Sequence, residues 1–233
     1  MRAIPTSRST LTFWEDLIFL EAALLADEET RELAAPVTAL INEFMPALQR
    51  DLETRRSLIQ SSARTSVADA RLDFGIRGLF SDTLHLVKQN RKRPEFTALF
   101  STHIGAVVRH ALKRQVEVAR DLLDKLGLPH YPEEFRSAQI HALQPLIARG
   151  AQVLEEQRQA ELARVGGRID VRTWKEEANA VRLSVYASLL ALAAKNGRGK
   201  PWAEVFFKQK SAAGESEDDG DAPVDGGEPP DEV

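Results

Sequence analysis

Apolar residues recur at intervals of three and four positions along most of this chain, and that spacing constrains the fold more than any other feature. The first such series runs from Phe13 through Leu17 and Leu20 to Leu24. This spacing places side chains on one face of an α-helix, whereas a half-buried strand needs an apolar residue at every second position. Sustained alternation bounded by turn residues does not occur in the sequence. We therefore predict an all-α fold, a helical bundle of six or seven helices.

Prolines, glycines and capping residues divide these series into predicted helices. Prolines inside a helical series are expected to kink a helix without ending it where the apolar series continues in phase. The predicted elements are a helix over 12–26, a long helix from Pro36 kinked at Pro46, a helix starting at Ser66, a helix from Pro94 to Leu126, a long helix from Pro132 kinked at Pro145 and ended by Gly166 and Gly167, a helix starting at Asp170, and a short helix from Pro201 to about Gln209.

One stretch of the chain, Leu72–Phe100, has a looser second version in Trp174–Phe207. Each begins with a helical series that carries an arginine, Arg77 or Arg182, and continues through a basic break and a proline to an aromatic end. The two arginines are about 105 residues apart. This similarity predicts two duplicated long-helix hairpins, with repeats at about 36–100 and 139–207. Chance remains the alternative, because Ala, Leu and Arg are abundant throughout.

Charge is distributed unevenly along the chain. Between residue 214 and the C-terminus there are nine acidic residues and no basic one, so residues 1–213 carry a net charge near +5. A segment of this composition buries too little apolar surface to offset its ordering entropy. We predict a flexible N-terminus over residues 1–9, a single helical-bundle domain over 10–209 and a disordered acidic tail over 210–233.

Composition also excludes several classes of protein. The chain contains no cysteine, which removes disulfides, thiolate metal sites and cysteine nucleophiles. Its N-terminus lacks the apolar core of a signal peptide, and the longest nearly uncharged helical run, between Arg182 and Lys195, is too short to span a bilayer. We expect a cytoplasmic protein that does not enter membranes.

Metal-binding patterns are weak in this sequence. A di-iron bundle needs Glu-x-x-His motifs on two helices, and the nearest pattern is Asp82-Thr-Leu-His85. His103 and His110 lie seven residues apart on the predicted 94–126 helix, but no carboxylate lies three or four residues from His103. We predict neither a metal site nor a cofactor.

The segment from Arg136 to His141 has an arginine and a histidine separated by four residues. This spacing resembles the Arg-x4-His motif of HEPN-type ribonucleases, which are also all-helical. The resemblance implies that His141 acts as general base and that Arg136 stabilises the charge on the phosphorane. It covers two fixed residues of six, with Ser137 after the arginine, and no further part of the chain.

Basic residues form a second candidate site, for polyanions such as nucleic acids. Acids are interspersed among them, and no aromatic residue alternates with them for base stacking. The acidic tail is an intramolecular competitor for the same residues, or else a solubilising extension. The candidates are Lys88, Arg91, Lys92, Arg93, Arg109, Lys113 and Arg114.

No set of polar residues on the inward faces of the predicted helices forms a catalytic constellation. We therefore predict a non-enzymatic scaffold or protein-interaction protein, which binds either another protein or a second copy of itself. The alternatives are nucleic-acid binding through residues 88–93 and, third, a HEPN-like ribonuclease. Aromatic residues near the ends of the domain are candidate contacts for a partner. They are Trp14, Trp202 and Phe207.

Overall fold

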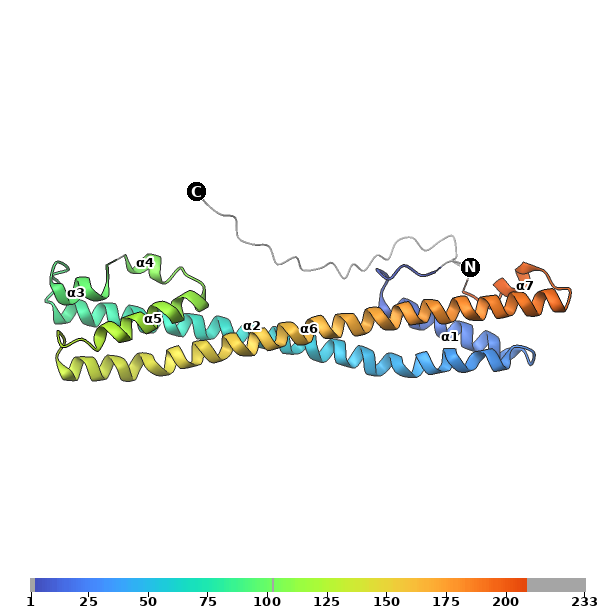
Figure 1. Cartoon of the computed structure of the whole chain (residues 1–233), viewed down its shortest axis with the longest axis horizontal. Coiled ribbons are helices and arrows are strands. Elements are labelled where there is room, and N and C mark those ends of the chain that lie inside the picture. Colours follow the sequence, from blue (N-terminus) through green and yellow to red (C-terminus); the bar gives the residue numbers. More distant parts are fainter. Residues whose placement is uncertain (1–2, 102, 209–233) are drawn as a thin grey trace. The chain divides into compact units, whose positions relative to one another are not determined.

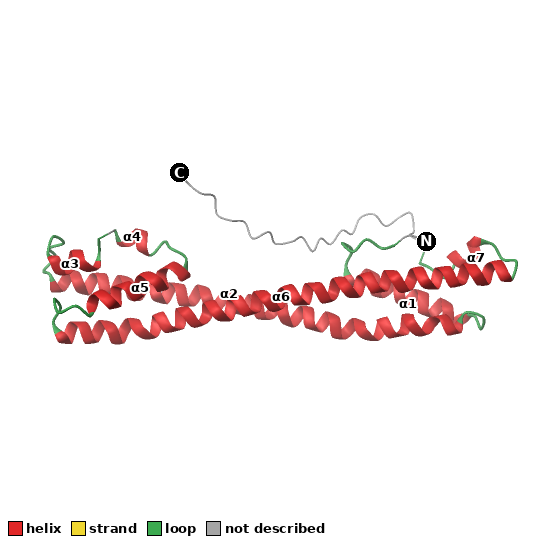
Figure 2. Cartoon of the chain, in the orientation of Figure 1, coloured by secondary structure: helices red, strands yellow, loops and turns green. Residues whose placement is uncertain are grey.

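The computed structural model describes residues 3–101 and 103–208, and within these ranges it contains helices joined by loops and no strand (Figures 1 and 2). This confirms the predicted all-α fold. The predicted disordered tail, residues 210–233, lies outside the described residues. The helices are α1 (Thr10–Ala26), η1 (a 3₁₀ turn, Arg31–Ala34), α2 (Ala35–Leu86), α3 (Pro94–Leu99), α4 (Ile104–Val107), α5 (Leu112–Leu126), α6 (Glu133–Lys195) and α7 (Lys200–Glu204).

The sequence predicts one domain over residues 10–209, whereas the contacts divide the chain into two compact units. Unit 1 comprises residues 1–50 and 168–233, and unit 2 comprises residues 51–167. Unit 1 contains α1, η1, α7, the first part of α2 and the last part of α6. Unit 2 contains α3, α4, α5, the rest of α2 and the first part of α6. The two long helices therefore contribute residues to both units.

Each unit has its own apolar core. In unit 1, the inner face of α1 packs with residues of α2, α6 and α7, including Phe44, Trp174 and Ala203. In unit 2, α5 packs with α2 and α6 through residues that include Leu72 and Val116. Within each unit α2 and α6 run antiparallel, because contacts join early residues of one helix to late residues of the other. Examples are Trp174 to Leu40 in unit 1, and Gln139 to Asp82 and Arg64 to Glu156 in unit 2.

The predicted helix start at Ser66 is wrong, because α2 continues through this residue. A serine that precedes an acidic residue by three positions resembles an N-terminal cap. Inside α2, the Ser66 hydroxyl instead donates to the carbonyl oxygen of Ser62, 3.2 Å away. This bond to the preceding turn is the usual one for a serine in a helix interior.

The predicted break at Gly166 and Gly167 is also wrong, because α6 continues past both glycines and past Asp170. A Cβ atom on Gly167 would lie 2.7 Å from the Thr54 hydroxyl oxygen. Gly167 therefore allows α6 to approach α2 closely in unit 2 and does not end a helix. Asp170 does not cap a helix either, since it lies inside α6 with its carboxylate 3.9 Å from the Arg50 side chain.

The predicted helix from Pro94 to Leu126 is divided into α3, α4 and α5. Two side chains satisfy backbone groups at the interruptions. The Nδ1 atom of His103 accepts a hydrogen bond from the Gly105 amide at the start of α4. The buried Gln115 amide donates to the carbonyl oxygens of Val108 and His110, just before α5. Because these caps replace helical hydrogen bonds, His103 and His110 do not lie on one helix.

The order of elements repeats along the chain. A helix of 17 residues (α1), a helix of 52 (α2) and a short helix beginning at a proline (α3) are followed, after α4, by helices of 15 (α5), 63 (α6) and 5 residues (α7). Pro46 lies inside α2 and Pro145 inside α6. This order agrees with an internal duplication, although its copies would begin at α1 and α5. Duplication itself stays a prediction.

Candidate functional site

The outward face of α1 in unit 1 is apolar. Leu11, Ile18 and Leu25 follow one another at seven-residue intervals and are 54%, 36% and 46% exposed, and Phe19 beside them is 42% exposed. The opposite face of α1 is also apolar and is fully buried. A helix that is apolar on both faces is normally covered on both faces. We name the four exposed residues the α1 stripe.

Aromatic packing fixes α1 against unit 1. Trp14 stacks on Phe44 of α2 with ring centroids 5.3 Å apart, and Phe44 contacts Trp174 of α6 at 5.5 Å. The Trp174 indole N–H donates to the carbonyl oxygen of Leu40, 3.1 Å away. Because three helices share this cluster, the α1 stripe is presented on a rigid support.

A buried ion pair also positions α1. Arg182 of α6 is 5% exposed, and its guanidinium lies 3.4 Å from the Asp16 carboxylate. Burial raises the pKa of Asp16, and the Arg182 charge opposes this rise. Burial likewise lowers the pKa of Arg182, against the effect of Asp16. This pair links α1 to α6 from the inner side, whereas Arg77, the counterpart of Arg182 in the sequence repeat, is exposed.

The N-terminal segment, predicted to be flexible, is anchored on the same helix. The Asn179 side chain accepts a hydrogen bond from the Ile4 amide and donates one to the Ile4 carbonyl oxygen, at 2.9 and 2.8 Å. The Lys175 ammonium donates to the carbonyl oxygens of Thr6 and Arg8. Two polar side chains of α6 therefore fix the chain that leads into α1, which begins at its Ser9 cap.

Charges beside the α1 stripe are acidic. Helix α1 contains Glu15, Asp16 and Glu21 and no basic residue. The Glu15 carboxylate lies 3.0 Å from the Lys208 ammonium, and Glu21 accepts a hydrogen bond from the Thr38 hydroxyl. An apolar stripe that contains Glu15 and is flanked by Glu21 favours a partner with an apolar face that also carries basic side chains.

The three aromatic residues predicted as partner contacts also lie in unit 1, but each packs within it. Phe207 is 7% exposed and meets Tyr186 at 5.6 Å, and Trp202 is half-buried against Phe206 at 5.1 Å. Trp14, described above, is half-buried as well. The contacts predicted from the sequence are large aromatic side chains, and they miss the α1 stripe, which is mostly aliphatic. Its signal was available, because α1 carries more apolar residues than one helix face can hold.

The predicted polyanion site is divided by the structure. The Tyr131 hydroxyl, just after the end of α5, donates to the Glu95 carbonyl oxygen, which places the loop of residues 87–93 near this end of α5. Arg109, Lys113 and Arg114 lie at its opposite end. A helix of 15 residues is about 22 Å long, so the basic residues form two groups and not one patch.

These basic residues also differ in whether an acidic side chain pairs with them. Arg93 lies 2.9 Å from Glu95, and Arg114 lies 2.7 Å from Glu117. The Arg91 guanidinium lies over the Phe80 ring, 5.6 Å from its centroid. Lys88 and Gln89 have φ angles of 54° and 62°, a backbone conformation uncommon outside glycine. This conformation turns the chain sharply after α2. The basic residues of the loop that follows are exposed to solvent.

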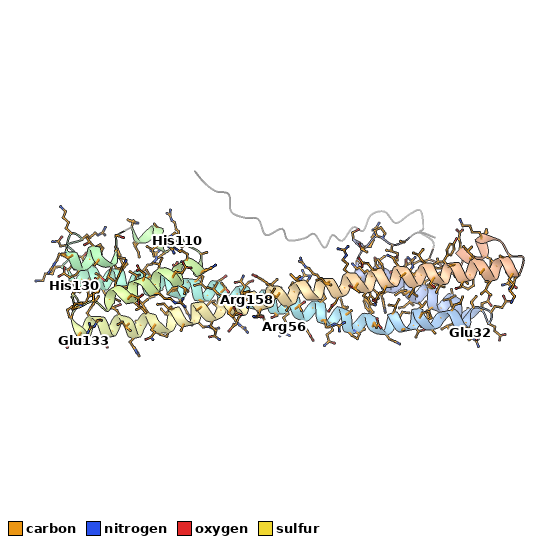
Figure 3. The ribbon with its side chains drawn as sticks, viewed as in Figure 1. Glu32, Arg56, His110, His130, Glu133 and Arg158 are labelled. Atoms are coloured by element: carbon orange, nitrogen blue, oxygen red, sulfur yellow. The ribbon has the colours of Figure 1, made fainter. Side chains whose placement is uncertain are left out.

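Arg136 and His141 both line an open hollow of about 310 Å³ on α6. All of its lining residues come from α6, and Arg136 is ion-paired with Glu133, which Figure 3 labels at this end of the helix. The exposed His141 therefore shares a surface with Arg136, but no second element of the described chain encloses them. The structure therefore places Arg136 and His141 near each other, but it shows no enclosed site for an RNA substrate.

The histidines considered as metal ligands lie apart from any ligand cluster. Asp82 accepts a hydrogen bond from the Gln139 amide at 2.8 Å, and His103 caps α4. Among residues 3–101 and 103–208, no three histidine or carboxylate side chains are placed to hold a metal ion. A search of the same ranges finds no helix with the length and apolar character needed to cross a membrane.

Another hollow, of about 610 Å³, lies in unit 1 between α2 and α6. Pro46 lines it, and because proline has no amide hydrogen, the Asn42 carbonyl lacks its helical partner here. The hollow is open, and its polar lining residues are exposed, including Arg50 and Asp170, which lie 3.9 Å apart. It offers hydrogen-bonding groups without enclosing a ligand.

Comparisons with family models, with curated proteins and with solved structures find no match to this chain.

Proposed function

We propose that this protein is a non-enzymatic interaction module that binds a basic amphipathic helix on the α1 stripe. One observation carries the proposal: α1 exposes Leu11, Ile18, Phe19 and Leu25 although its other face already fills the core of unit 1. Leaving four large apolar side chains of one helix in water is unfavourable, so such a group marks a binding surface. Residues spaced by seven match the contacts that one helix makes along another.

The acidic side chains at the stripe define the chemistry of the partner. Glu15 and Glu21 favour lysine and arginine on the bound helix and disfavour acidic side chains. They also disfavour an anionic membrane surface. The chain's own acidic segment after residue 214 is a poor occupant for the same reason, since its nine acids would face those of α1.

The test uses a synthetic helix of leucine and lysine heptads, with a leucine and glutamate helix of equal length as the charge control. Fluorescence anisotropy should show saturable binding of the basic helix and weaker binding of the acidic one. Ile18→Asp should abolish binding, because it places a charge in the middle of the stripe. Leu128→Asp is the matched control, since Leu128 is 44% exposed and lies in unit 2. Equal binding by both variants, or no saturable binding by the unaltered chain, contradicts the proposal.

A second candidate, polyanion binding by the loop of residues 88–93, is favoured by the pairing of its charges. Lys88, Arg91 and Lys92 are exposed, and within the described part of the chain none of them has an acidic group in salt-bridge range. Cations without paired acids are available to phosphates, and their binding releases counterions.

The loop is tested by changing Lys88, Arg91 and Lys92 together to Gln and measuring affinity for a single-stranded RNA at several salt concentrations. Loss of three phosphate contacts should lower the salt slope by about 2. The control changes Arg109 and Lys113, at the other end of α5, to Gln. If both variants lower the slope equally, the loop is not the site.

A further inference from the structure

The outward face of α2 in unit 2 is a second apolar surface, separate from the α1 stripe. Leu52, Ile59, Val67 and Phe74 are 55%, 63%, 54% and 79% exposed. They succeed one another at intervals of seven, eight and seven residues, with Ala63 at the centre. The spacing places them along one face of the helix. We name these five residues the α2 seam.

Between Leu52 and Ala68, the buried residues of α2 are small. Ser61 and Ala68 are 3% and 6% exposed; on α6, Ala160 is 5% exposed and Gly167 packs on Thr54. Two helices that approach through small residues leave their large apolar residues outside, which reverses the usual arrangement of a two-helix coiled coil. Figure 3 labels Arg56 on α2 and Arg158 on α6 in this part of unit 2. The four large residues of the seam are all more than half exposed, so α6 does not cover the seam.

The order of residues in the seam identifies its occupant. Leu52 lies eleven residues before Ala63 and Phe74 eleven after it, while Ile59 lies four before and Val67 four after. An antiparallel copy of the same helix, centred on Ala63, would place Leu52 against Phe74 and Ile59 against Val67. A surface that matches itself in this way is what a two-fold symmetric interface requires.

Charges beside the seam support the same register. Glu53 and Arg71 border one side of the seam, and Arg55 and Asp73 border the other. In a two-fold antiparallel pair, each border faces the same border of the partner. Glu53 then lies near the partner's Arg71, and Arg55 near the partner's Asp73, so opposite charges meet on both sides.

Two further positions fit the pairing. Arg56 falls opposite Ala70, where its aliphatic stem covers the small side chain while its guanidinium reaches solvent. Arg64 approaches its own copy beside the centre, and its guanidinium already lies 3.4 Å from Glu156. Alanine at the centre allows the two helices to approach closely.

We propose that the α2 seam is a self-association surface through which two copies of this chain form an antiparallel, two-fold symmetric dimer centred on Ala63. The proposal is independent of the α1 stripe, which lies in unit 1. It concerns residues of unit 2 alone.

The absence of cysteine in the chain permits a direct test by single-cysteine cross-linking. Ala63→Cys should form a disulfide-linked dimer on mild oxidation, because the two Cα atoms then lie within about 7 Å. Leu52→Cys is the matched control on the same seam. Its two copies would lie about 33 Å apart, so it should not link to itself. A mixture of Leu52→Cys and Phe74→Cys chains should link in the mixed pair.

The oligomeric state provides the second measurement. Sedimentation of the unaltered chain should show a dimer, and Phe74→Asp should weaken it about tenfold or more. Because Phe74 is already exposed, its helical circular dichroism should stay unchanged. A monomer, a dimer insensitive to Phe74→Asp, or Leu52→Cys linking to itself as readily as Ala63→Cys would each overturn the proposal. Val165 lies exposed on α6. If Val165→Asp abolished association and Ala63→Cys did not cross-link, the interface would lie on α6, and the proposal would also be overturned.

Discussion

At the scale of single residues, Arg182 and Arg77 occupy matching places in the sequence repeat but different environments. Arg182 is buried beside Asp16 and lies 5.9 Å from the Phe207 ring centroid, whereas Arg77 is exposed. Arg182→Ala would leave the Asp16 carboxylate buried without its cation. We expect a loss of about 3 kcal/mol in the free energy of unfolding. Arg77→Ala should change it by no more than about 0.5 kcal/mol. Urea denaturation of both variants measures the difference, and similar losses would show that the pair does not stabilise the fold.

Asp69 gives a prediction for pH. One oxygen of Asp69 and one of Asp73 are buried without a hydrogen-bond partner in the described structure. Burial raises the pKa of Asp69, and the Asp73 charge one turn away raises it further. A carboxyl whose pKa is higher in the folded state binds its proton more tightly there, so its contribution to stability falls as pH rises above 3.8, the ordinary value.

Asp69→Asn removes this effect and should therefore stabilise the protein at neutral pH, by less than about 1 kcal/mol because solvent screens a half-buried carboxylate. The gain should shrink as the pH is lowered through the raised pKa of Asp69, because the carboxyl of the unaltered chain is then protonated. Thermal unfolding at pH 7 and at pH 4 measures both values. A variant less stable than the unaltered chain at pH 7 would show that the carboxylate makes a favourable interaction.

At the scale of elements, the sequence predicts where helices occur better than where they end. The apolar spacing gives α1, and α6 ends at Lys195, just before Gly197, whose φ of +65° suits a glycine. Ser66 and Gly167 satisfy the local rules for a start and a stop. Tertiary contacts decide otherwise, because a helix continues wherever packing against a neighbour outweighs a local signal. The division of residues 94–126 could not be predicted, since it depends on side-chain caps from His103 and Gln115.

Adjacent glycines in α6 provide a matched test of this account. A Cβ on Gly166 would meet nothing within 4 Å, whereas one on Gly167 would lie 2.7 Å from the Thr54 hydroxyl oxygen. Gly166→Ala should stabilise the helix by about 0.5–1 kcal/mol. Gly167→Ala should destabilise the protein by about 1–3 kcal/mol, and Thr54→Ala in the same chain should recover part of the loss. Chemical denaturation gives the signs. Stabilisation by both glycine variants would mean that the close approach of the helices is not needed.

The candidate surfaces were predicted less well than the helices. Exposure at Leu11 or Phe74 depends on how many helices cover α1 and α2, and the sequence does not give that number. It does give an excess of apolar residues over what one helix face can bury. The sequence predicts partner contacts at large aromatic residues, namely Trp14, Trp202 and Phe207. Large aromatic side chains also pack well inside a fold, and here they pack against Phe44, Phe206 and Tyr186.

At the scale of the whole molecule, two separate cores predict two separable transitions. All three tryptophans lie in unit 1, so their fluorescence reports on that unit, while circular dichroism reports on the helices of both. Leu20→Ala in the unit 1 core should lower the fluorescence midpoint, with a cost of about 2–5 kcal/mol. Leu122→Ala in the unit 2 core should lower the circular dichroism midpoint and leave the fluorescence midpoint in place. Equal shifts of both signals in both variants would show that the chain unfolds as one cooperative body.

The central claim, that the α1 stripe binds a basic amphipathic helix, is tested most directly by a probe placed within the stripe. Because the chain has no cysteine, Leu25→Cys can carry a single environment-sensitive fluorophore, and Leu128→Cys in unit 2 serves as the reference. Addition of the leucine and lysine helix should shift the emission of the probe at residue 25 to shorter wavelengths in a saturable way, because the stripe loses water. The probe at residue 128 should not respond. No shift at residue 25, or an equal shift at both positions, would contradict the account.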